Sequence, residues 1–225
     1  MDNQRVTVLT LLDFSNAFST VDFDLLSDIL RTLNISPEVT DWFQNYLHGR
    51  RQRVRVNDPF SSWTTVSAGV PQGGVLSPLL FSIFINPICK VISSLYHLYA
   101  DDLQIYTHCT IAELPQAVSR INHDLLEVTN WSRSFGLAIN PRKSQAIIIG
   151  SSKFISRINK SQLPPILFDV IEIPYSENVT NLGVLIDQTL SWGPQICEIS
   201  RKVFSTVGSL RRLQNFLPTS TKIAL

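Results

Sequence analysis

The sequence VTVLTLLD, residues 6–13, combines β-branched and leucine side chains in a short run that stops at an aspartate. Such a run predicts a buried strand that ends at Asp13. Further along, two apolar runs flank Ala100-Asp101-Asp102, which predicts a strand, a tight turn and a second strand. A buried carboxylate without a partner is costly, so packing alone rarely places aspartates at strand ends. If these strands are neighbours in one sheet, the three carboxylates lie together at one rim.

Three carboxylates at one rim suit divalent metal chemistry. Like charges at close range repel unless protons or cations hold them together. Mg²⁺ prefers a few carboxylate oxygens together with substrate phosphates, and two ions about 3.5–4 Å apart stabilise both the attacking and the leaving oxygen of a phosphoryl displacement. Each aspartate also has an ordinary explanation. Asp101 and Asp102 in a tight turn would accept backbone hydrogen bonds, and Asp13 would cap a helix or turn.

Length and composition indicate a globular chain with one large domain, or one domain plus an appendage. Of the 225 residues, 44% are hydrophobic and 16% are charged, which excludes disordered, coiled-coil and collagen-like proteins. The 19 basic and 18 acidic residues leave a net charge of +1, so any nucleic-acid binding has to rest on local charge. Three widely separated cysteines and an N-terminus without a secretory pattern predict a reduced, intracellular protein.

The longest apolar stretch, residues 75–92, is interrupted by two prolines, an asparagine and a lysine, so we expect no membrane span. It predicts a buried helix capped by Ser77, with Pro78 in the first turn. Further helices are expected at 24–33, 37–49, 114–136 and 196–213, strands at 137–139, 145–149, 166–173 and 179–186, and a hairpin from 51–56 and 62–66. Helices and strands alternate irregularly, which is typical of the α+β class.

A glycine-rich loop precedes the 75–92 helix. Residues 69–74, GVPQGG, place three glycines around a proline and an amide. Glycines there allow a ligand to approach the backbone, and the helix start offers free N–H groups to anions. A purely structural turn explains the loop equally well. The loop has neither the lysine of a Walker loop nor the glycine spacing of a dinucleotide fingerprint.

These segments together resemble the reverse transcriptases, and the residues within the motifs are most similar to those of non-LTR (LINE-like) retrotransposons. LDFSNAF at 12–18 is similar to motif A, GVPQG at 69–73 to motif B, and YADD at 99–102 to motif C. GLAINPRK at 136–143 resembles motif D, and NLGV at 181–184, with Asp187 and LSW at 190–192, resembles motif E and the entry to the thumb. The five motifs follow the family's order and cover nearly the whole chain.

The resemblance implies a polymerase palm, which is a ferredoxin-like antiparallel sheet with helices on one face. Residues 1–175 would form the palm, with a small fingers-proximal hairpin at about 50–68. Residues 176–225 would form a primer-grip-like hairpin and part of a helical thumb. The resemblance also implies RNA-directed DNA synthesis, with an RNA template, a DNA primer and deoxynucleoside triphosphates as partners, and action in the nucleus.

Roles at the catalytic corner follow from the resemblance, position by position. Asp13 and Asp101 would hold two Mg²⁺ ions, for which Mn²⁺ is an alternative. Asp102 would be a weaker or indirect partner, and the Phe14 carbonyl an additional ligand. Lys143 would donate a proton to pyrophosphate; the alternative is a solvated surface lysine.

Roles in nucleotide binding follow in the same way. Asn16 and Ala17 would present backbone donors to the phosphates. Gln72 and Gly73 would contact the incoming nucleotide and the template base. Phe18 matches the family's steric gate, a ring beneath the sugar that leaves no room for a ribose 2′-hydroxyl. The alternative for Phe18 is an ordinary core phenylalanine.

Nucleic-acid contacts are expected on three surfaces. The resemblance implies contacts from Leu182 and Gly183 in the primer-grip-like hairpin. The period-two alternation places Arg51, Arg53 and Arg55 on one strand face, for which the alternative is a solvated edge strand whose charges deter aggregation. The segment 199–225, which includes Arg201 and Lys202, carries a local charge of +5; phosphate contacts there predict a steep salt dependence, and a solvated helix face is the alternative.

Three positions depart from the family pattern without removing a metal ligand. Ser19, Gly74 and Gln195 stand where the family usually has aspartate, serine and histidine. Because almost nothing precedes the first strand, we expect the fingers to be largely absent and the chain to be a truncated or decaying copy. Two alternatives to polymerase activity remain, a catalytically inactive nucleic-acid-binding remnant and a metal-dependent phosphohydrolase.

Overall fold

The computed structural model describes residues 4–213 and is built around a six-stranded sheet. Its strands are β1 (Val6–Ser15), β4 (Leu95–Tyr99), β5 (Asp102–Cys109), β6 (Ala138–Ile139), β7 (Gln145–Ile149) and β10 (Tyr175–Ser176). Their order is β10-β7-β1-β5-β4, and β6 pairs with the end of β1. All pairs are antiparallel except β10 with β7, which is parallel. The predicted α+β class is confirmed, with a sheet that is mixed through this one parallel pair.

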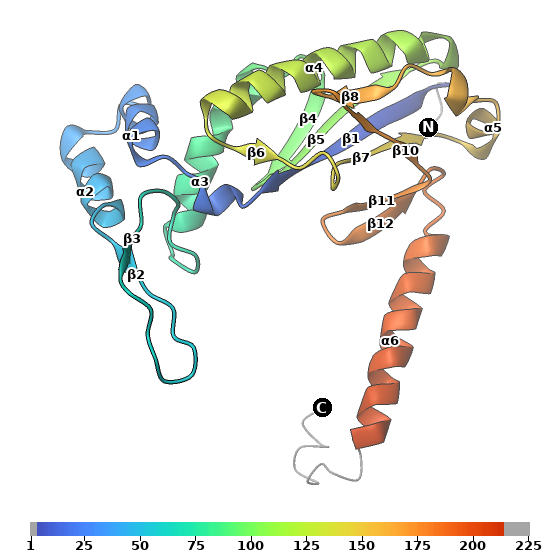
Figure 1. Ribbon diagram of the computed structural model, residues 1–225. Coiled ribbons are helices and arrows are strands. Elements are labelled where there is room, and N and C mark those ends of the chain that lie inside the picture. The colour runs from blue at the N-terminus through green and yellow to red at the C-terminus, as the bar shows by residue number, and fades with distance from the viewer. Residues whose placement is uncertain (1–3, 214–225) are drawn as a thin grey trace.

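The long helix α4 (Leu114–Ser134) lies along one face of the sheet, and α3 (Ser77–Ile85) contributes to the same core (Figure 1). The helices α1 (Phe23–Thr32) and α2 (Pro37–Leu47) lie beyond the end of the sheet, where α1 packs against α2 and α3 (Figure 1). Side chains alternate between the two faces of a strand. In β1 this alternation directs Val8 and Leu12 into the main core, which also contains Phe81 and Leu125 of the helices. The apolar patterns that predict these strands and helices thus fit together as one buried layer.

The opposite face of the sheet carries a smaller apolar cluster. Leu9 and Leu11 of β1 pack there against Val179. Val179 belongs to a two-stranded hairpin formed by β11 (Asn178–Asn181) and β12 (Val184–Asp187). Because Asp13 continues the odd-numbered series of Leu9 and Leu11, its side chain belongs to this less covered face.

The 75–92 segment is helical for a shorter length than its apolar pattern predicts. α3 ends at Ile85, and a 3₁₀ segment, η2 (Asn86–Lys90), follows. Pro87 lies inside the expected helix and has no N–H to continue its ladder. The expected Ser77 cap is also wrong, because Leu76 occupies the N-cap position. The Ser77 hydroxyl instead donates to the Pro71 carbonyl of the glycine-rich loop.

The other helices begin close to their expected positions. Asp22 caps α1 by accepting a hydrogen bond from the Leu25 N–H at 2.8 Å. Ser36 is the N-cap of α2, but its side chain makes no capping hydrogen bond. The remaining short elements are η1 (Ala17–Ser19), η3 (Ile111–Glu113), α5 (Ser152–Ile155) and η4 (Lys160–Gln162).

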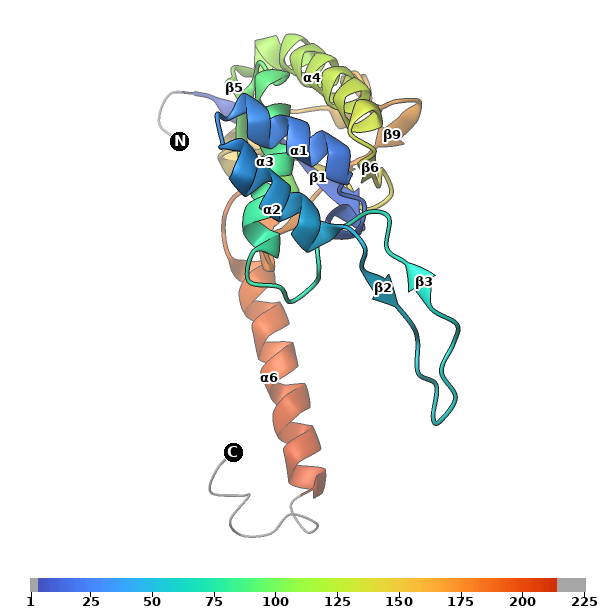
Figure 2. The same cartoon turned by 90° about the vertical axis from the view of Figure 1, so that its left-hand side faces the viewer.

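The hairpin expected at residues 51–66 has little regular pairing. Only β2 (Arg51–Gln52) and β3 (Thr64–Thr65) form a ladder, with one isolated bridge between Arg55 and Phe60. Every residue from 51 to 65 is exposed, and a two-stranded hairpin without a buried face is at best marginally stable. Figure 2 shows this hairpin projecting from the body.

Two runs near the C-terminus that look like single strands form hairpins, and the second of them is the hairpin that the resemblance implies after residue 176. The 166–173 run is divided into β8 (Ile166–Phe168) and β9 (Ile171–Ile173), with Asp169 in the left-handed region at φ 57°. The 179–186 run turns between β11 and β12. The C-terminal helix α6 (Gly193–Leu213) then extends away from the sheet (Figures 1 and 2). No helix among residues 4–213 is long and apolar enough to cross a membrane.

Candidate active site

Asp13 and Asp102 face each other across neighbouring strands. In the antiparallel pair of β1 with β5, Asp13 is aligned with Asp102 at the end of the register. Residues directly opposite in such a pair have Cα atoms about 4.5–5.5 Å apart and side chains on the same face. The strands that carry motif A and motif C are therefore neighbours in one sheet, as the predicted grouping of the aspartates requires.

A two-residue turn places Asp101 beside this pair. Tyr99 pairs with Asp102 across β4 and β5, so Ala100 and Asp101 form the turn. Ala100 has a φ of 51°, a left-handed conformation that is uncommon for a residue with a Cβ and is unfavourable by about 1–3 kcal/mol. Backbone strain of this kind concentrates at functional sites, and here it lies next to Asp101.

The carboxylates at this corner influence one another. Partial burial raises the pKa of Asp102 above its usual value, and the charges of Asp101 and Asp13 raise it further. The pKa is raised because the ionised form loses hydration and meets like charges at once. A cation placed among the three carboxylates would remove both penalties.

The motif D loop is attached to the backbone of Asp13. The Asn140 N–H donates to the Asp13 carbonyl at 2.8 Å, and the Asp13 N–H donates to the Ser144 hydroxyl at 3.4 Å. These bonds place the Lys143 ammonium 3.7 Å from Asp13 Oδ2. Lys143 is 68% exposed, so a ligand can reach it. Ser144 was not predicted from the sequence, because its contact with the Asp13 N–H depends on strand register rather than on a motif.

One carboxylate oxygen of Asp13 is suited to bind a metal ion. Asp13 Oδ2 is buried and has no hydrogen-bond partner, and the Lys143 ammonium pairs with it only at the long distance of 3.7 Å. A cation at closer range would supply the missing contact. The neighbouring donors are carboxylate oxygens, the type that Mg²⁺ prefers. Within residues 4–213, however, no three acidic, histidine or cysteine side chains are arranged to hold a metal ion by themselves. Asp13 and Asp102 converge, whereas Asp101 does not complete a three-carboxylate set.

Motif A leaves the sheet through a left-handed residue. Asn16 has a φ of 51° and precedes the 3₁₀ segment η1; asparagine tolerates this conformation better than most residues. Ala17 is buried, and Asn16 is exposed. The Phe18 ring stacks on Phe81 of α3, with 4.2 Å between ring centroids. Phe18 is only half-buried, so its ring combines a core contact with an accessible surface.

The motif B loop is joined to the end of motif A by backbone hydrogen bonds. The Gly69 N–H donates to the Val21 carbonyl at 2.8 Å, and the Val70 N–H donates to the Phe18 carbonyl at 2.8 Å. Gly69 has a φ of +92°, and a Cβ there would lie 2.7 Å from the Ser19 carbonyl oxygen. Only glycine allows this approach, so Gly69 fixes the loop next to Phe18.

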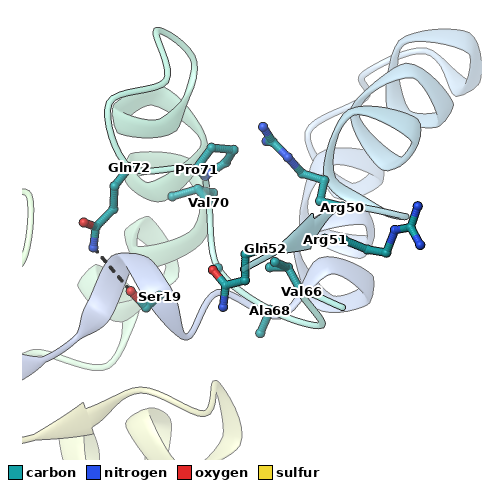
Figure 3. A pocket seen from close by; sticks show the side chains of 10 residues that line it. Ser19, Arg50, Arg51, Gln52, Val66, Ala68, Val70, Pro71 and Gln72 are labelled. Carbon is teal, nitrogen blue, oxygen red and sulfur yellow. Dashed lines mark hydrogen bonds between the residues drawn. The ribbon is translucent and has the colours of Figure 1, made fainter. Parts of the chain in front are cut away.

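A cavity of about 550 Å³ opens where the motif B loop meets the base of the 51–66 hairpin. Figure 3 shows Gln72 pointing towards Ser19, to which its Nε2 donates at 3.4 Å. Arg50 and Gln52 line the cavity from the hairpin base, while the Arg51 side chain extends away from Gln72 (Figure 3). Gly73 is exposed, in a left-handed conformation at φ +78°. The cavity thus combines positive charge with amide groups.

Residues 1–186 match the family model described as "Reverse transcriptase (RNA-dependent DNA polymerase)". The chain belongs to the reverse transcriptase family. The match covers both aspartate motifs, the glycine-rich loop and the primer-grip-like hairpin, in agreement with the resemblance seen in the sequence.

Several curated relatives are reverse transcriptases of insect transposable elements. The chain is 26% identical to the probable RNA-directed DNA polymerase from transposon BS of Drosophila melanogaster, over 98% of this chain and 24% of the relative. It is 28% identical to the corresponding protein from transposon X-element of the same fly, over 73% and 18%. The chain therefore spans about a quarter or less of the length of these relatives.

A solved structure supports the reverse transcriptase fold. An apo telomerase from Candida tropicalis, truncated from its C-terminal domain, matches with a TM-score of 0.56. The match covers 83% of this chain and 35% of the telomerase chain, at 14% identity. At this identity the similarity establishes the fold alone.

In this member of the reverse transcriptase family, the β11–β12 turn lies close to strand β5. Leu182 and Gly183 form the turn, with φ values of 47° and 81°, and Leu182 is exposed. The neighbouring Asn181 Oδ1 accepts a hydrogen bond from Gln104 Nε2 at 2.7 Å. Gln104 is two residues from Asp102, so this bond holds the turn near the carboxylate corner.

Asp187 fixes the start of α6. Its carboxylate accepts hydrogen bonds from the backbone N–H groups of Thr189, Ser191 and Trp192 and from the Thr189 hydroxyl. Burial acts to raise the pKa of Asp187, but the hydrogen bonds from Thr189 and Ser191 outweigh it and hold the pKa well below its usual value. Asp187 is therefore a structural anchor.

The basic residues of α6 are partly neutralised. Arg201 makes an ion pair with Glu198 at 2.8 Å, and Lys202 reaches the same carboxylate at 3.4 Å. Glu198 lies one residue before the acid-free segment expected from the sequence, so the charge there is lower than the sequence segment suggests. Arg211 and Arg212 lie in the last turn, and Lys222 lies outside the described residues.

Arg51, Arg53 and Arg55 share one face of the 51–66 hairpin. Arg53 lies over the rings of Phe60 and Trp63, at 3.8 and 4.5 Å from their centroids. Arg51 lies 5.7 Å from the Trp63 centroid and Arg55 5.3 Å from that of Phe60. The two rings were not predicted from the sequence, because their position opposite the arginines depends on how the two strands of the hairpin pair.

Proposed function

We propose that this chain is a reverse transcriptase domain that transfers deoxynucleoside monophosphates to a primer 3′-hydroxyl under the direction of an RNA template. The alignment of Asp13 with Asp102 beside the Asp101 turn carries the proposal. Family membership and the polymerase names of the relatives support it. The backbone hydrogen bonds that join motif A to motif B hold the cavity in which the nucleotide would be bound.

Two Mg²⁺ ions, or Mn²⁺ in their place, are proposed cofactors. Asp13 and Asp101 would hold them, with Asp102 and the Phe14 carbonyl as further donors. Bound ions would make the primer hydroxyl more acidic and offset the charge of the leaving pyrophosphate. The Asp13 Oδ2 atom without a hydrogen-bond partner and the raised pKa of Asp102 support this proposal, because a buried carboxylate oxygen and crowded carboxylates both favour a bound cation.

The chain's own residues would bind and orient the nucleotide. The Asn16 and Ala17 N–H groups would bind its phosphates, and Gln72 and Gly73 would contact the nucleotide and the template base. Phe18 would exclude a ribose 2′-hydroxyl, for which its stacking on Phe81 supplies a rigid position.

Lys143 would protonate the departing pyrophosphate. Its ammonium lies 3.7 Å from Asp13, and a positioned acid lowers the barrier to loss of a charged leaving group. When substrate phosphates arrive, they would compete with Asp13 for this ammonium.

RNA and primer contacts are proposed for three surfaces already described. Leu182 and Gly183 would support the primer end near Gln104. Arg51, Arg53 and Arg55 would contact the template side, and the basic residues of α6 would contact phosphates of the duplex. These contacts are largely electrostatic, so binding should weaken as salt rises.

A second candidate function is nucleic-acid binding without catalysis. It is favoured by the lack of a complete three-ligand metal set among residues 4–213. A protein of this kind would bind template through the arginines and α6 but would not extend a primer.

Primer extension by the full chain separates the proposals. With an RNA template, Mg²⁺ and all four deoxynucleotides, we expect DNA synthesis that is lost in Asp13→Asn and Asp101→Asn, while RNA binding persists. Asp28→Asn is the matched control, because Asp28 is an exposed acid paired with Arg31. Absence of synthesis in the unaltered chain, with RNA binding intact, would favour the non-catalytic function. Phosphate release without a primer would indicate a phosphohydrolase.

A further inference from the structure

The 51–66 hairpin carries two large exposed rings to which the proposed function above gives no role. Phe60 is 48% exposed and Trp63 55% exposed. The side chains of Arg51, Arg53 and Arg55 lie over these rings, with guanidinium-to-centroid distances from 3.8 to 5.7 Å. We call these five residues the hairpin face. An edge that only deters aggregation needs charge but no large exposed rings.

The hairpin face carries an excess of positive charge. Asp58 is its acidic neighbour and pairs with Arg55 at 3.3 Å. Within residues 4–213, neither Arg51 nor Arg53 forms an ion pair with an acidic side chain. The two guanidinium groups are instead held by the faces of the aromatic rings. Their charge is thus available to phosphate groups, whereas their position is fixed by stacking.

Alternating rings and guanidinium planes suit unpaired nucleotides. Bases that are not paired expose their faces and stack on aromatic side chains and on arginine planes. In a duplex the base faces are covered by neighbouring bases, so the rings would have nothing to stack on. Arginine charge alone would bind both forms, but the presence of Phe60 and Trp63 favours the single strand.

The position of the hairpin fits a strand that approaches the catalytic site. The hairpin projects from the body (Figure 2), and its first strand β2 continues into the cavity beside the motif B loop. Arg50 and Gln52, on either side of Arg51, line that cavity (Figure 3). Arg51 of the hairpin face also lines that cavity, so a strand bound along the hairpin face would reach the mouth of the cavity at the hairpin base.

We propose that the hairpin face binds the unpaired RNA template by base stacking before the template is copied. The inference rests on the proposed function in one respect, which is that the bound RNA is the template to be copied. The binding of unpaired RNA itself does not depend on catalysis and can be measured separately.

The test is equilibrium binding, by fluorescence anisotropy, of the full chain to a 15-nucleotide unstructured RNA, the DNA of the same sequence, and an RNA–DNA duplex of the same length. The ring variant Phe60→Leu/Trp63→Leu keeps all charges. We expect it to bind the single-stranded RNA at least about fivefold more weakly, the lower limit for loss of one base–aromatic stack, with little change for the duplex. Val54→Ala/Val56→Ala, at two exposed positions of the same hairpin, is the matched control and should bind all three ligands normally.

Three outcomes would overturn the inference. They are unchanged RNA binding by the ring variant, an equal loss for single strand and duplex, and a ring effect confined to the DNA strand. An equal ring effect on RNA and DNA supports it, because stacking does not read the 2′-hydroxyl. Asp101→Asn separates this inference from the proposed function. We expect Asp101→Asn to bind RNA normally and to synthesise no DNA. If the unaltered chain synthesises no DNA but the ring variant still binds RNA more weakly, the polymerase proposal fails and the inference about the hairpin face holds.

Discussion

At the scale of single residues, the molecule keeps like charges close together where β1 meets the β4–β5 turn. Asp13 and Asp102 are aligned, Asp101 is in the adjoining turn, and Ala100 is left-handed. None of these features improves stability, so we attribute them to function. The aspartates themselves could be selected from the sequence by their positions after strand-like runs. Their alignment could not, because alternation along a strand does not specify which strand is its neighbour or in which register.

The raised pKa of Asp102 predicts a pH-dependent penalty on the fold. A carboxyl whose pKa is higher in the folded state binds its proton more tightly there, so its contribution to stability is present at low pH and is lost as pH rises through the folded pKa. Asp102→Asn should therefore raise the free energy of unfolding at pH 7 by about 0.5 kcal/mol, since the site is only partly buried and solvent screens the charges. Urea unfolding at pH 4 and pH 7 measures this, with a smaller gain at pH 4. A loss of stability at pH 7 would contradict the repulsion described.

Phe18 should have two separable roles. In Phe18→Val the loss of stacking on Phe81 should lower the free energy of unfolding by about 1–2 kcal/mol. If the ring also excludes the 2′-hydroxyl, the preference for deoxy- over ribonucleotides should fall by about tenfold or more. Single-nucleotide incorporation with matched dGTP and GTP measures the preference. An active variant with unchanged sugar preference would leave Phe18 as a core residue.

At the scale of elements, the differences from expectation occur at turns. The 166–173 and 179–186 runs look like single strands because they are rich in β-branched and other apolar residues, yet Asp169 and Leu182 adopt left-handed conformations that divide each into a hairpin. Leucine rarely does so, and nothing in its residue type signals the turn. Helix starts were easier to predict: Ser36-Pro37 marks α2 within one residue. Long periodic segments such as α4 were also predictable, because tertiary contacts and pattern agree there.

Gly69 should be the least replaceable residue of the motif B loop. In Gly69→Ala the new Cβ would lie 2.7 Å from the Ser19 carbonyl oxygen in a strained conformation, so we expect a loss of more than about 1 kcal/mol in the free energy of unfolding and a higher KM for nucleotides. Gly49→Ala is the control, because Gly49 is also left-handed, at φ +71°, but has open space around its Cα. Thermal unfolding and steady-state primer extension measure both. Equal effects in the two variants would show that the close approach at Ser19 is unimportant.

At the scale of the whole molecule, a nearly neutral chain carries two groups of basic residues on parts that project from the sheet, the 51–66 hairpin and α6. The net charge of +1 hides this separation. The sequence indicated both basic segments, but not that Arg201 and Lys202 share Glu198 while Arg51 and Arg53 are held on aromatic rings. The difference matters for binding, because an arginine already paired with a carboxylate has less to gain from a phosphate.

The salt dependence of RNA binding should reflect this difference. Arg53→Gln should lower the slope of log affinity against log salt by about one, the value for loss of one phosphate contact. Arg201→Gln should change the slope less, because Glu198 already neutralises part of that charge. Anisotropy titrations between 50 and 200 mM salt, a range that resolves such slopes, give both values. A larger change for Arg201→Gln would place the main phosphate contacts on α6.

The central claim is that Asp13 and the 99–102 turn together bind the divalent ions used in DNA synthesis. Mn²⁺ binding to the full chain, followed by electron paramagnetic resonance, tests it without requiring activity. We expect the unaltered chain and the Asp28→Asn control to bind Mn²⁺ with the same affinity. Asp13→Asn and Asp101→Asn should each bind Mn²⁺ at least about tenfold more weakly, because each lacks one charged ligand. Equal Mn²⁺ affinity in all four proteins would contradict the account.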